Sequence, residues 1–428
     1  MTHKTFCKIP FTQIATFNDN HYHHCYAGIP TDSDLTDFTQ FAVKKEDGSP
    51  FDIRETSFIN VWNSEWYKKL RLDLINGVQN PSCKHCWDRE KVGGWSPRLK
   101  EIAGVQSIEQ EIKSMNLDGS LTVGPRYLEI RTGNFCNLKC IACHPVNSTE
   151  IVKEVKAWRT MLVEIPKHIN MSDQSLNKIN KSFNKNDILT GIADIIDGVE
   201  EIQFYGGEPL VTHEVALFLD DLIKLGRSQF LKIKLITNLT ITNQKIFDKL
   251  DSFKEVELIV SWDHVDPIKS HYIRYPQDYE KFLTNFERIL HNPVYNIKLS
   301  PTISIFNIYD IPDIFDKFEE LNHLTNKKIP LSSNILEIPK YFSILYLKNN
   351  QKKEIITIID QYIEKNKSYK LFENGNSSAY NNLLKLKNLM YQHPTDYDEV
   401  ITERTRILEL YDQTRATNSK KLFPYLYE

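Results

Sequence analysis

Long apolar runs are missing from this chain of 428 residues, and so is any excess of charge of one sign. No apolar stretch approaches the roughly 18 residues that a membrane-spanning helix needs. The first ten residues, MTHKTFCKIP, lack the apolar core of a signal peptide. Lysine plus arginine number 53 and aspartate plus glutamate 56, whereas proteins that bind nucleic acids non-specifically are usually strongly basic. We therefore expect a cytoplasmic protein that has neither a membrane nor a nucleic acid as its partner.

The chain also lacks the composition of a disordered protein, which has few hydrophobic residues. Hydrophobic residues make up 41% and charged residues 25%, which is ordinary globular composition. A globular chain of this length corresponds to about three ordinary domains, or to one large domain with appendages.

A disulfide framework is not expected, because the number of cysteines is odd and no secretion signal precedes them. Three of the seven cysteines lie within eight residues, two form a C-x2-C pair, and two stand alone near the N-terminus. Clustered thiols in a reducing compartment are more often metal ligands than disulfide partners. The cysteines are Cys7, Cys25, Cys83, Cys86, Cys136, Cys140 and Cys143.

Alternating strands and helices are predicted from residue 127 onwards. Repeated β-then-α units predict a parallel sheet, and periodicity alone does not choose between an open sheet and a partial barrel. The expected strands are 127–131, 201–205, 231–236, 256–261 and 298–306, with a sixth within 335–347. We expect three parts: a small cysteine-rich unit at 1–100, a core at 120–348 and a helical extension at 349–428. The first part is expected to begin with a hairpin of the strands 11–16 and 21–26.

The strongest motif is C-x3-C-x2-C, formed by Cys136, Cys140 and Cys143 directly after the first strand of the core. Three thiolates in so short a loop suit one iron–sulfur cluster, and they leave one iron of a four-iron cluster without a protein ligand. An open position on a metal is where a substrate or cofactor binds. The alternatives are a structural zinc loop and an ordinary cluster that His144 completes.

A second motif, Gly206-Gly207-Glu208-Pro209, falls at the end of the next predicted strand. Two glycines allow a ligand to approach the backbone closely, and the Glu208 carboxylate suits an ammonium group. Alone, this sequence is more often a simple strand-to-helix turn. Here it follows the cysteine motif by one βα unit, which favours a shared binding site.

Together the two motifs resemble the radical S-adenosylmethionine (SAM) superfamily. The resemblance implies that Cys136, Cys140 and Cys143 hold a [4Fe–4S] cluster whose free iron binds the amino and carboxylate groups of SAM, with the GGEP segment contacting the amino group. It implies reductive cleavage of SAM to methionine and a 5′-deoxyadenosyl radical, which takes a hydrogen atom from a substrate. It also favours a partial (β/α)6 TIM-like barrel over an open sheet.

Polar residues at other strand ends fit this resemblance, because working residues of barrel enzymes gather at the C-terminal ends of the strands. Asn238, Ser261 and Asp263 are the best candidates for further SAM contacts, ahead of Asn307. Arg274 is a candidate carboxylate ligand, although a surface arginine at a helix start explains it equally well. One departure from the family is Ala142, where an aromatic residue commonly precedes the third cysteine.

The other four cysteines, Cys7, Cys25, Cys83 and Cys86, supply the number of thiolates that a fully protein-ligated metal site needs. Their setting resembles a twitch domain, the shorter relative of the SPASM domain, which implies a second, auxiliary [4Fe–4S] cluster. Twitch domains more often follow the barrel, whereas this candidate precedes it. A four-cysteine zinc site is the alternative, and surface histidines are alternative ligands. These histidines are His21, His23, His24 and His85.

The sequence therefore predicts a radical SAM enzyme with an auxiliary cluster, an external reductant such as flavodoxin or ferredoxin, and a peptide or protein as the substrate. Two other classes stay open. One is a non-catalytic iron–sulfur or SAM-binding regulatory protein on the same barrel. The other is a zinc-stabilised α/β interaction protein.

Overall fold

The computed structural model describes most of the chain in two compact units. The described residues are 4–26, 41–91, 96–103, 105, 107–179, 181–241, 243–325, 329–367 and 379–428. Unit 1 comprises Met1–Phe135, Met171–Leu235 and Asn243–Val256, and unit 2 comprises Cys136–Asn170, Ile236–Thr242 and Glu257–Glu428. Among the described helices, none combines the length and the apolar character that crossing a membrane requires.

One mainly parallel sheet has its strands in the order β2-β1-β3-β4-β5-β6-β7, and β8 pairs separately with β9. The strands are β1 Gln13–Thr16, β2 Tyr22–His23, β3 Tyr127–Arg131, β4 Glu201–Tyr205, β5 Lys232–Thr237, β6 Glu255–Val260, β7 Tyr295–Leu299, β8 Thr302–Ile303 and β9 Asn334–Ile335. Only β1 and β2 are antiparallel among the strand pairs whose register is defined. The predicted parallel α/β architecture is confirmed.

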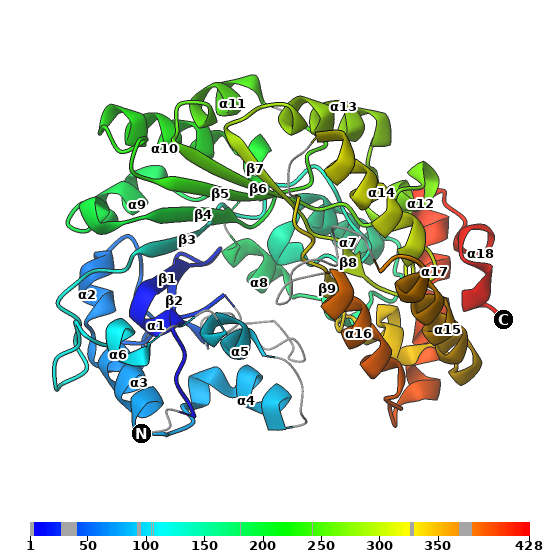
Figure 1. Ribbon diagram of the computed structural model, residues 1–428, viewed down its shortest axis with the longest axis horizontal. Coiled ribbons are helices and arrows are strands. Elements are labelled where there is room, and N and C mark those ends of the chain that lie inside the picture. The colour runs from blue at the N-terminus through cyan, green and yellow to red at the C-terminus, as the bar shows by residue number, and fades with distance from the viewer. Residues whose placement is uncertain are drawn as a thin grey trace. The chain divides into compact units, whose positions relative to one another are not determined.

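Helices follow the strands as the sequence predicts. Unit 1 holds α1 Ile9–Thr12, α2 Phe58–Trp62, α3 Glu65–Ile75, α4 Lys84–Lys91, α5 Pro97–Ile102, α6 Ile108–Glu111, α8 Asp173–Lys178, α9 Lys185–Ile192, α10 His213–Lys224 and α11 Gln244–Leu250. Unit 2 holds α7 Thr149–Thr160, α12 Pro267–Ile273, α13 Tyr279–Leu290, α14 Ile311–Thr325, α15 Asn349–Lys365, α16 Ala379–Met390, α17 Tyr397–Arg415 and α18 Ser419–Leu422. The predicted helical extension is thus present, with α15 packed against α16 (Figure 1).

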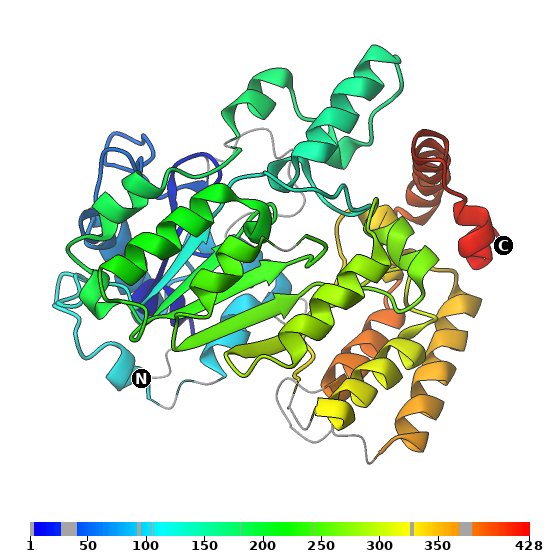
Figure 2. The same cartoon turned by 90° about the horizontal axis from the view of Figure 1, so that it is seen from above.

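The two faces of the sheet in unit 1 differ in character because side chains alternate along a strand. On one face, Phe204 of β4 packs edge-on against Phe218 of α10, with 5.8 Å between ring centroids. Helices α9, α10 and α11 cover this face (Figures 1 and 2). The other face is polar, since the register aligns His23, Glu129, Gln203 and Lys234 in one row across five strands, with Ala15 between His23 and Glu129. Such a face is unlike a packed apolar barrel core.

Three local expectations are corrected. The strand expected at 298–306 is interrupted at Ser300 and Pro301, so β7 ends at Leu299 and β8 is separate. The sixth strand shrinks to β9, and 3-10 turns follow it at Lys340–Phe342 and Ile344–Tyr346.

The N-terminal hairpin forms, but its β1 also pairs in parallel with β3 and so extends the main sheet. Helix α4 follows the turn Pro81–Cys83 and has the basic residues Arg89 and Lys91 in its last turn, where positive charge stabilises a helix.

Candidate functional site

Backbone hydrogen bonds to a neighbouring segment hold the C-x3-C-x2-C loop in unit 2. Lys139 N–H donates to the Tyr275 carbonyl at 2.7 Å, and Ile141 N–H donates to the Ile273 carbonyl at 2.9 Å. Ser148 begins helix α7 by accepting hydrogen bonds from two N–H groups of its first turn. The Ser148 hydroxyl also donates to the Leu138 carbonyl at 2.5 Å. The three cysteines therefore lie on a loop that is fixed on both sides.

Two N–H donors point at the sulfur of Cys136. Leu138 N–H lies 3.5 Å from Cys136 Sγ, and Asn238 Nδ2 lies 3.8 Å from it. The Asn238 amide is oriented by Thr240, whose N–H and hydroxyl both donate to Asn238 Oδ1. Donors that face a sulfur stabilise the thiolate over the thiol. The structure thus places Asn238 against the cysteine loop.

The other two thiols of the loop are shielded from water, and this raises the pKa of each. For Cys143 the pKa rises to about 12, chiefly through burial and further through repulsion from Cys140. Burial also raises the pKa of Cys140, while the nearby guanidinium groups of Arg274 and Arg415 act in the opposite direction. Thiolates in this loop need a positive partner, which an iron–sulfur cluster supplies when bound.

Asp263 and Arg274 form a buried ion pair beside this loop, with 2.8 Å between Asp263 Oδ2 and Arg274 Nη2. Asp263 Oδ1 accepts the Thr302 N–H at 2.7 Å, so both carboxylate oxygens are engaged. Asn307 donates to the Asp263 carbonyl at 2.9 Å. Burial by itself would lower the pKa of Arg274, but Asp263 and Cys140 outweigh it and raise the pKa. Arg274 is therefore a buried partner of Asp263, and the interpretation as a surface arginine is wrong.

The GGEP segment belongs to unit 1 and is bonded to the residues that lead into the cysteine loop. Gly207 N–H donates to the Gly133 carbonyl and Glu208 N–H to the Phe135 carbonyl, both at 2.8 Å. A Cβ atom on Gly207 would lie 2.2 Å from the Phe135 oxygen. Glycine is needed here because the chain's own backbone passes so closely, whereas the sequence interpretation gave ligand approach as the reason.

Glu208 and Pro209 begin a 3-10 turn, Pro209–Val211, in which the Glu208 carboxylate accepts the Leu210 N–H at 3.1 Å. Both residues are buried. Ser261 follows β6 and is half-buried, and its N–H donates to the Thr237 carbonyl at 2.9 Å. His144 caps the turn after Cys143, since its Nδ1 accepts the Val146 N–H at 3.2 Å.

The remaining four cysteines line one pocket in unit 1 that opens to solvent. Cys7 precedes α1, Cys25 follows β2, Cys83 ends the turn Pro81–Cys83, and Cys86 lies in α4. The lining residues are Cys7, Ile9, Pro10, His24, Cys25, Ser82, Cys83, His85, Cys86 and Arg98. Sequence segments more than 50 residues apart thus bring all four predicted thiols together.

Burial dominates the electrostatics of this pocket too. It raises the pKa of Cys83 to about 12, with a further rise from Cys86 and an opposing effect from Arg98. Burial also raises the pKa of Cys7, and repulsion from Cys83 and Cys86 adds to it. The donor chemistry therefore fits a cationic metal cluster as the partner of these thiols.

The histidines near this pocket are not surface groups throughout. His23 and His24 are 1% and 3% exposed, which corrects the expectation of surface histidines. Burial lowers the pKa of His24 to about 3, so its ring is neutral. Among the described residues, no group of three or more histidine, cysteine and acidic side chains has the geometry to hold a single metal ion.

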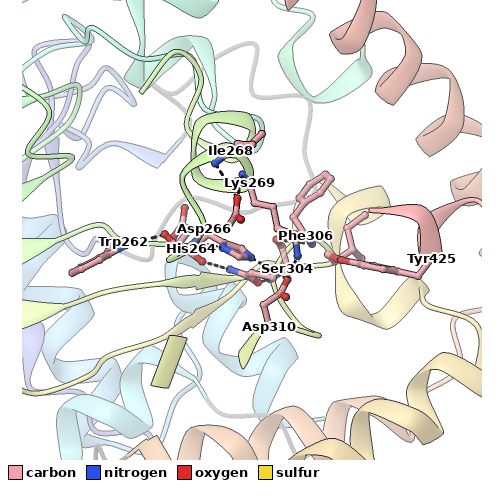
Figure 3. A network of polar contacts seen from close by, with 12 residues as sticks. Trp262, His264, Asp266, Ile268, Lys269, Ser304, Phe306, Asp310 and Tyr425 are labelled. Carbon is pink, nitrogen blue, oxygen red and sulfur yellow. Dashed lines mark hydrogen bonds and ion pairs between the residues drawn. The ribbon is translucent and has the colours of Figure 1, made fainter. Parts of the chain in front are cut away.

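A polar network at the end of β6 was missed by the sequence analysis (Figure 3). His264 Nε2 and Asp310 Oδ2 lie 3.0 Å apart, and Lys269 Nζ lies 2.7 Å from the same oxygen. Asp266 N–H donates to His264 Nδ1 at 2.9 Å. Tyr425 donates to the Ile305 carbonyl at 2.7 Å, which ties the C-terminal segment to the same region. No spacing in the sequence relates His264 to Asp310, so no pattern could have found this pair.

Comparison with known proteins gives one family match. Residues 130–321, just under half of the chain, match the family model of the Radical SAM superfamily. The match contains both the cysteine loop and the GGEP segment. This part of the chain is therefore similar to the Radical SAM superfamily, and the match agrees with the predicted α/β fold class.

Solved structures of proteins with bound S-adenosylmethionine are similar at low identity. Streptococcus suis SuiB bound to S-adenosylmethionine is 13% identical with a TM-score of 0.35, and the match covers 71% of this chain and 62% of SuiB. Native anSMEcpe with bound AdoMet is 16% identical with a TM-score of 0.40, and the match covers 59% of this chain and 64% of anSMEcpe.

A second SuiB structure, bound to the precursor peptide SuiA, is 15% identical with a TM-score of 0.38, and the match covers 70% of this chain and 63% of that chain. This chain thus spans less than two thirds of the length of these proteins. TM-scores below 0.5 transfer no substrate or partner to it. No curated protein matches the sequence.

Proposed function

We propose that this protein is a radical SAM enzyme that binds a [4Fe–4S] cluster through Cys136, Cys140 and Cys143 and abstracts hydrogen from a peptide or protein substrate. When bound, the reduced cluster supplies the electron that cleaves SAM to methionine and a 5′-deoxyadenosyl radical. The electron would come from a donor such as flavodoxin or ferredoxin.

One observation carries this proposal, and it is the bonding of the GGEP segment to residues 133–135. Gly207 and Glu208 donate their N–H groups to the Gly133 and Phe135 carbonyls. Phe135 is followed directly by Cys136. The GGEP segment, 70 residues further along the chain than Cys136, is therefore bonded to the three residues that directly precede the cysteine motif, and this supports the proposal that both motifs serve one cofactor.

The chain's own residues would divide the work. Gly206, Gly207, Glu208 and Pro209 would meet the amino group of SAM, and Asn238 and Ser261 would contribute further polar contacts. Asn238 Nδ2 stabilises the Cys136 thiolate at 3.8 Å. Because both oxygens of Asp263 are engaged, we propose that Asp263 acts by positioning Arg274.

We propose that Cys7, Cys25, Cys83 and Cys86 hold an auxiliary [4Fe–4S] cluster in a twitch-type N-terminal unit of SPASM/twitch character. All four thiols line the same pocket, so the protein can supply one cysteine ligand to each of the four irons of the cluster. A cluster without an open iron is suited to electron transfer rather than to direct binding of a substrate. The peptide or protein substrate is proposed on the resemblance of the motifs to this subgroup.

The decisive experiment measures 5′-deoxyadenosine by liquid chromatography and mass spectrometry. Protein that has been anaerobically reconstituted with iron and sulfide is reduced with dithionite and given SAM. We expect 5′-deoxyadenosine from the wild type and none from Cys140→Ala, which removes one cluster ligand. A wild type that carries the cluster and binds SAM but yields no 5′-deoxyadenosine would contradict the proposed activity and favour a regulatory role.

The auxiliary cluster is tested by iron and sulfide analysis. Two [4Fe–4S] clusters correspond to about eight iron atoms per chain, and loss of either cluster to about four. We expect Cys83→Ala to lose one cluster and to keep the one that responds to SAM. We expect Cys140→Ala to lose the SAM-responsive cluster and to keep the other. A wild type with one cluster, or with zinc bound in the N-terminal pocket, would contradict the auxiliary cluster alone.

A further inference from the structure

An ion triad of Arg415, Glu154 and Lys139, of which the first two are buried, connects the C-terminal extension to the cysteine loop, and all three residues lie in unit 2. Arg415 binds Glu154 in a bidentate pair, with Nε 3.0 Å from Oε1 and Nη2 2.7 Å from Oε2. Lys139 Nζ lies 2.8 Å from the same Glu154 Oε1. Lys139 stands between Cys136 and Cys140 within the C-x3-C motif. Arg415 therefore reaches the cluster loop through one carboxylate.

The position of Arg415 is set by the end of helix α17. Arg415 is the last residue of α17, and Ala416 ends the helix in the left-handed conformation with φ of 52°. Asp412 accepts hydrogen bonds from the Thr417 hydroxyl and from the N–H of Ser419. The guanidinium lies over the ring of Tyr411, 4.1 Å from its centroid. These contacts fix a side chain that is almost completely buried.

Arg415 also has a hydrogen-bond donor that no described residue accepts. Its Nη1 is buried and has no hydrogen-bond partner in the described part of the chain, and the same is true of Arg274 Nε. A buried N–H without an acceptor is costly, so an anionic group that arrives with a cofactor would satisfy it.

We propose that Arg415 is a positioning residue of the cysteine loop, which holds Lys139 through Glu154 and raises the reduction potential of the cluster at Cys140. The inference rests on the proposed function, because it assumes that the loop binds a [4Fe–4S] cluster. It extends that function to a residue outside the family match, which ends at residue 321.

The direction of the effect follows from charge. Reduction adds one negative charge to the cluster, and a fixed positive charge in a region of low dielectric constant favours the more negative state. The Glu154 carboxylate neutralises part of the positive charge of Arg415 and Lys139, because both side chains pair with it. Two cations therefore share one carboxylate, which leaves one positive charge in excess.

The test is a redox titration followed by electron paramagnetic resonance, with Arg415→Gln, Arg415→Lys and a control. The cluster in question is the one whose signal changes when SAM is added. For Arg415→Gln we expect an about tenfold lower ratio of reduced to oxidised cluster at a fixed solution potential, which is about 59 mV for one electron. Arg415→Lys keeps the charge, so we expect it to restore most of the ratio.

The control is Arg406→Gln, in the same helix. Arg406 pairs with Glu403 at 2.6 Å and donates to the Glu164 carbonyl, so its loss removes an ion pair that does not involve the cysteine loop. We expect no change in the ratio. If Arg415→Gln fails to fold, Lys139→Met removes a less buried charge of the same triad and is expected to lower the ratio in the same direction.

The outcomes separate this inference from the proposed function. An unchanged ratio in both Arg415→Gln and Lys139→Met, with lower iron content or thermal stability only, would make the triad purely structural and overturn the inference. In that case the wild type would still show its SAM-responsive cluster. A wild type without any SAM-responsive cluster would overturn the proposed function as well.

Discussion

Glu129 and Arg131 form a buried ion pair on β3, with 3.2 Å between Glu129 Oε1 and Arg131 Nε. The Arg131 guanidinium lies between the rings of Tyr205 and Phe17, at 3.6 and 4.4 Å from their centroids. Glu129 is 2% and Arg131 6% exposed. The pair stands on the polar face of the sheet in unit 1, where an unpaired charge would be expensive.

Arg131→Met should destabilise the protein because it leaves the Glu129 carboxylate buried without its closest cation. Breaking a buried ion pair costs about 3 kcal/mol or more, and His23 and Lys234 near Glu129 keep the cost at the lower end. Urea unfolding of the metal-free protein at neutral pH measures this loss. The double variant Glu129→Gln, Arg131→Met removes both charges and should recover most of it. A double variant as unstable as the single one would show that Glu129 is not the source of the cost.

Gly207→Ala should disturb the approach to the cysteine loop. The added methyl group would meet the Phe135 carbonyl, so the backbone must move, and overpacking of this kind costs about 1–3 kcal/mol. Since Cys136 follows Phe135, we also expect weaker binding of SAM to the reconstituted protein, measured by equilibrium dialysis. The matched control is Gly198→Ala, where a methyl group meets nothing within 4 Å. Equal effects of the two substitutions would show that the loss comes from glycine flexibility and not from the contact with Phe135.

Strands of the core could be predicted from sequence because each is a short apolar-alternating run bounded by turns. β3 and β4 have the predicted limits, Tyr127–Arg131 and Glu201–Tyr205. The pairing of β1 with β3 could not be predicted, since the 110 residues between Thr16 and Tyr127 carry no signal for their partner. β8 and β9 are only two residues long, which is too short for a periodic pattern.

The candidate ligands could be predicted because their chemistry is encoded in local spacing. Cys136, Cys140 and Cys143 lie within one loop, and Cys83 and Cys86 within one turn and helix. The groups that act on these thiols come from distant segments and have no local signature. Glu154 and Arg415 are 261 residues apart, and each would be an ordinary surface charge in its helix if sequence alone were considered.

Asn238→Asp should weaken the hold on a cluster at Cys136. The amide N–H that faces Cys136 Sγ at 3.8 Å is replaced by a carboxylate oxygen, which repels a thiolate. We expect a chelator to remove iron several-fold faster from this variant than from the wild type. The decrease in visible absorption of the cluster measures this rate. Asn243→Asp is the control, because Asn243 caps helix α11 by accepting the Lys245 N–H and an aspartate does so equally well. Equal rates of iron loss in the wild type and in Asn238→Asp would show that Asn238 does not stabilise the binding of a cluster at Cys136.

The stability of the protein should depend on pH through Glu129. Burial, the largest effect, raises the pKa of Glu129 above its usual 4.5, although Arg131, His23 and Lys234 act against it. Between 4.5 and the raised pKa, the folded protein holds a proton that the unfolded chain has released. The free energy of unfolding therefore falls as the pH rises through this range.

Glu129→Gln removes this titration and mimics the protonated carboxyl group, so the variant should gain stability relative to the wild type as the pH rises from about 4.5 towards 7. Urea unfolding of the metal-free proteins at several pH values gives this difference directly. Glu200→Gln, which changes an exposed carboxylate of the same unit, should run parallel to the wild type. A difference between Glu129→Gln and the wild type that shrinks as the pH rises would mean that Arg131 and its neighbours outweigh burial, and that the ion pair at 3.2 Å stabilises the folded state at neutral pH.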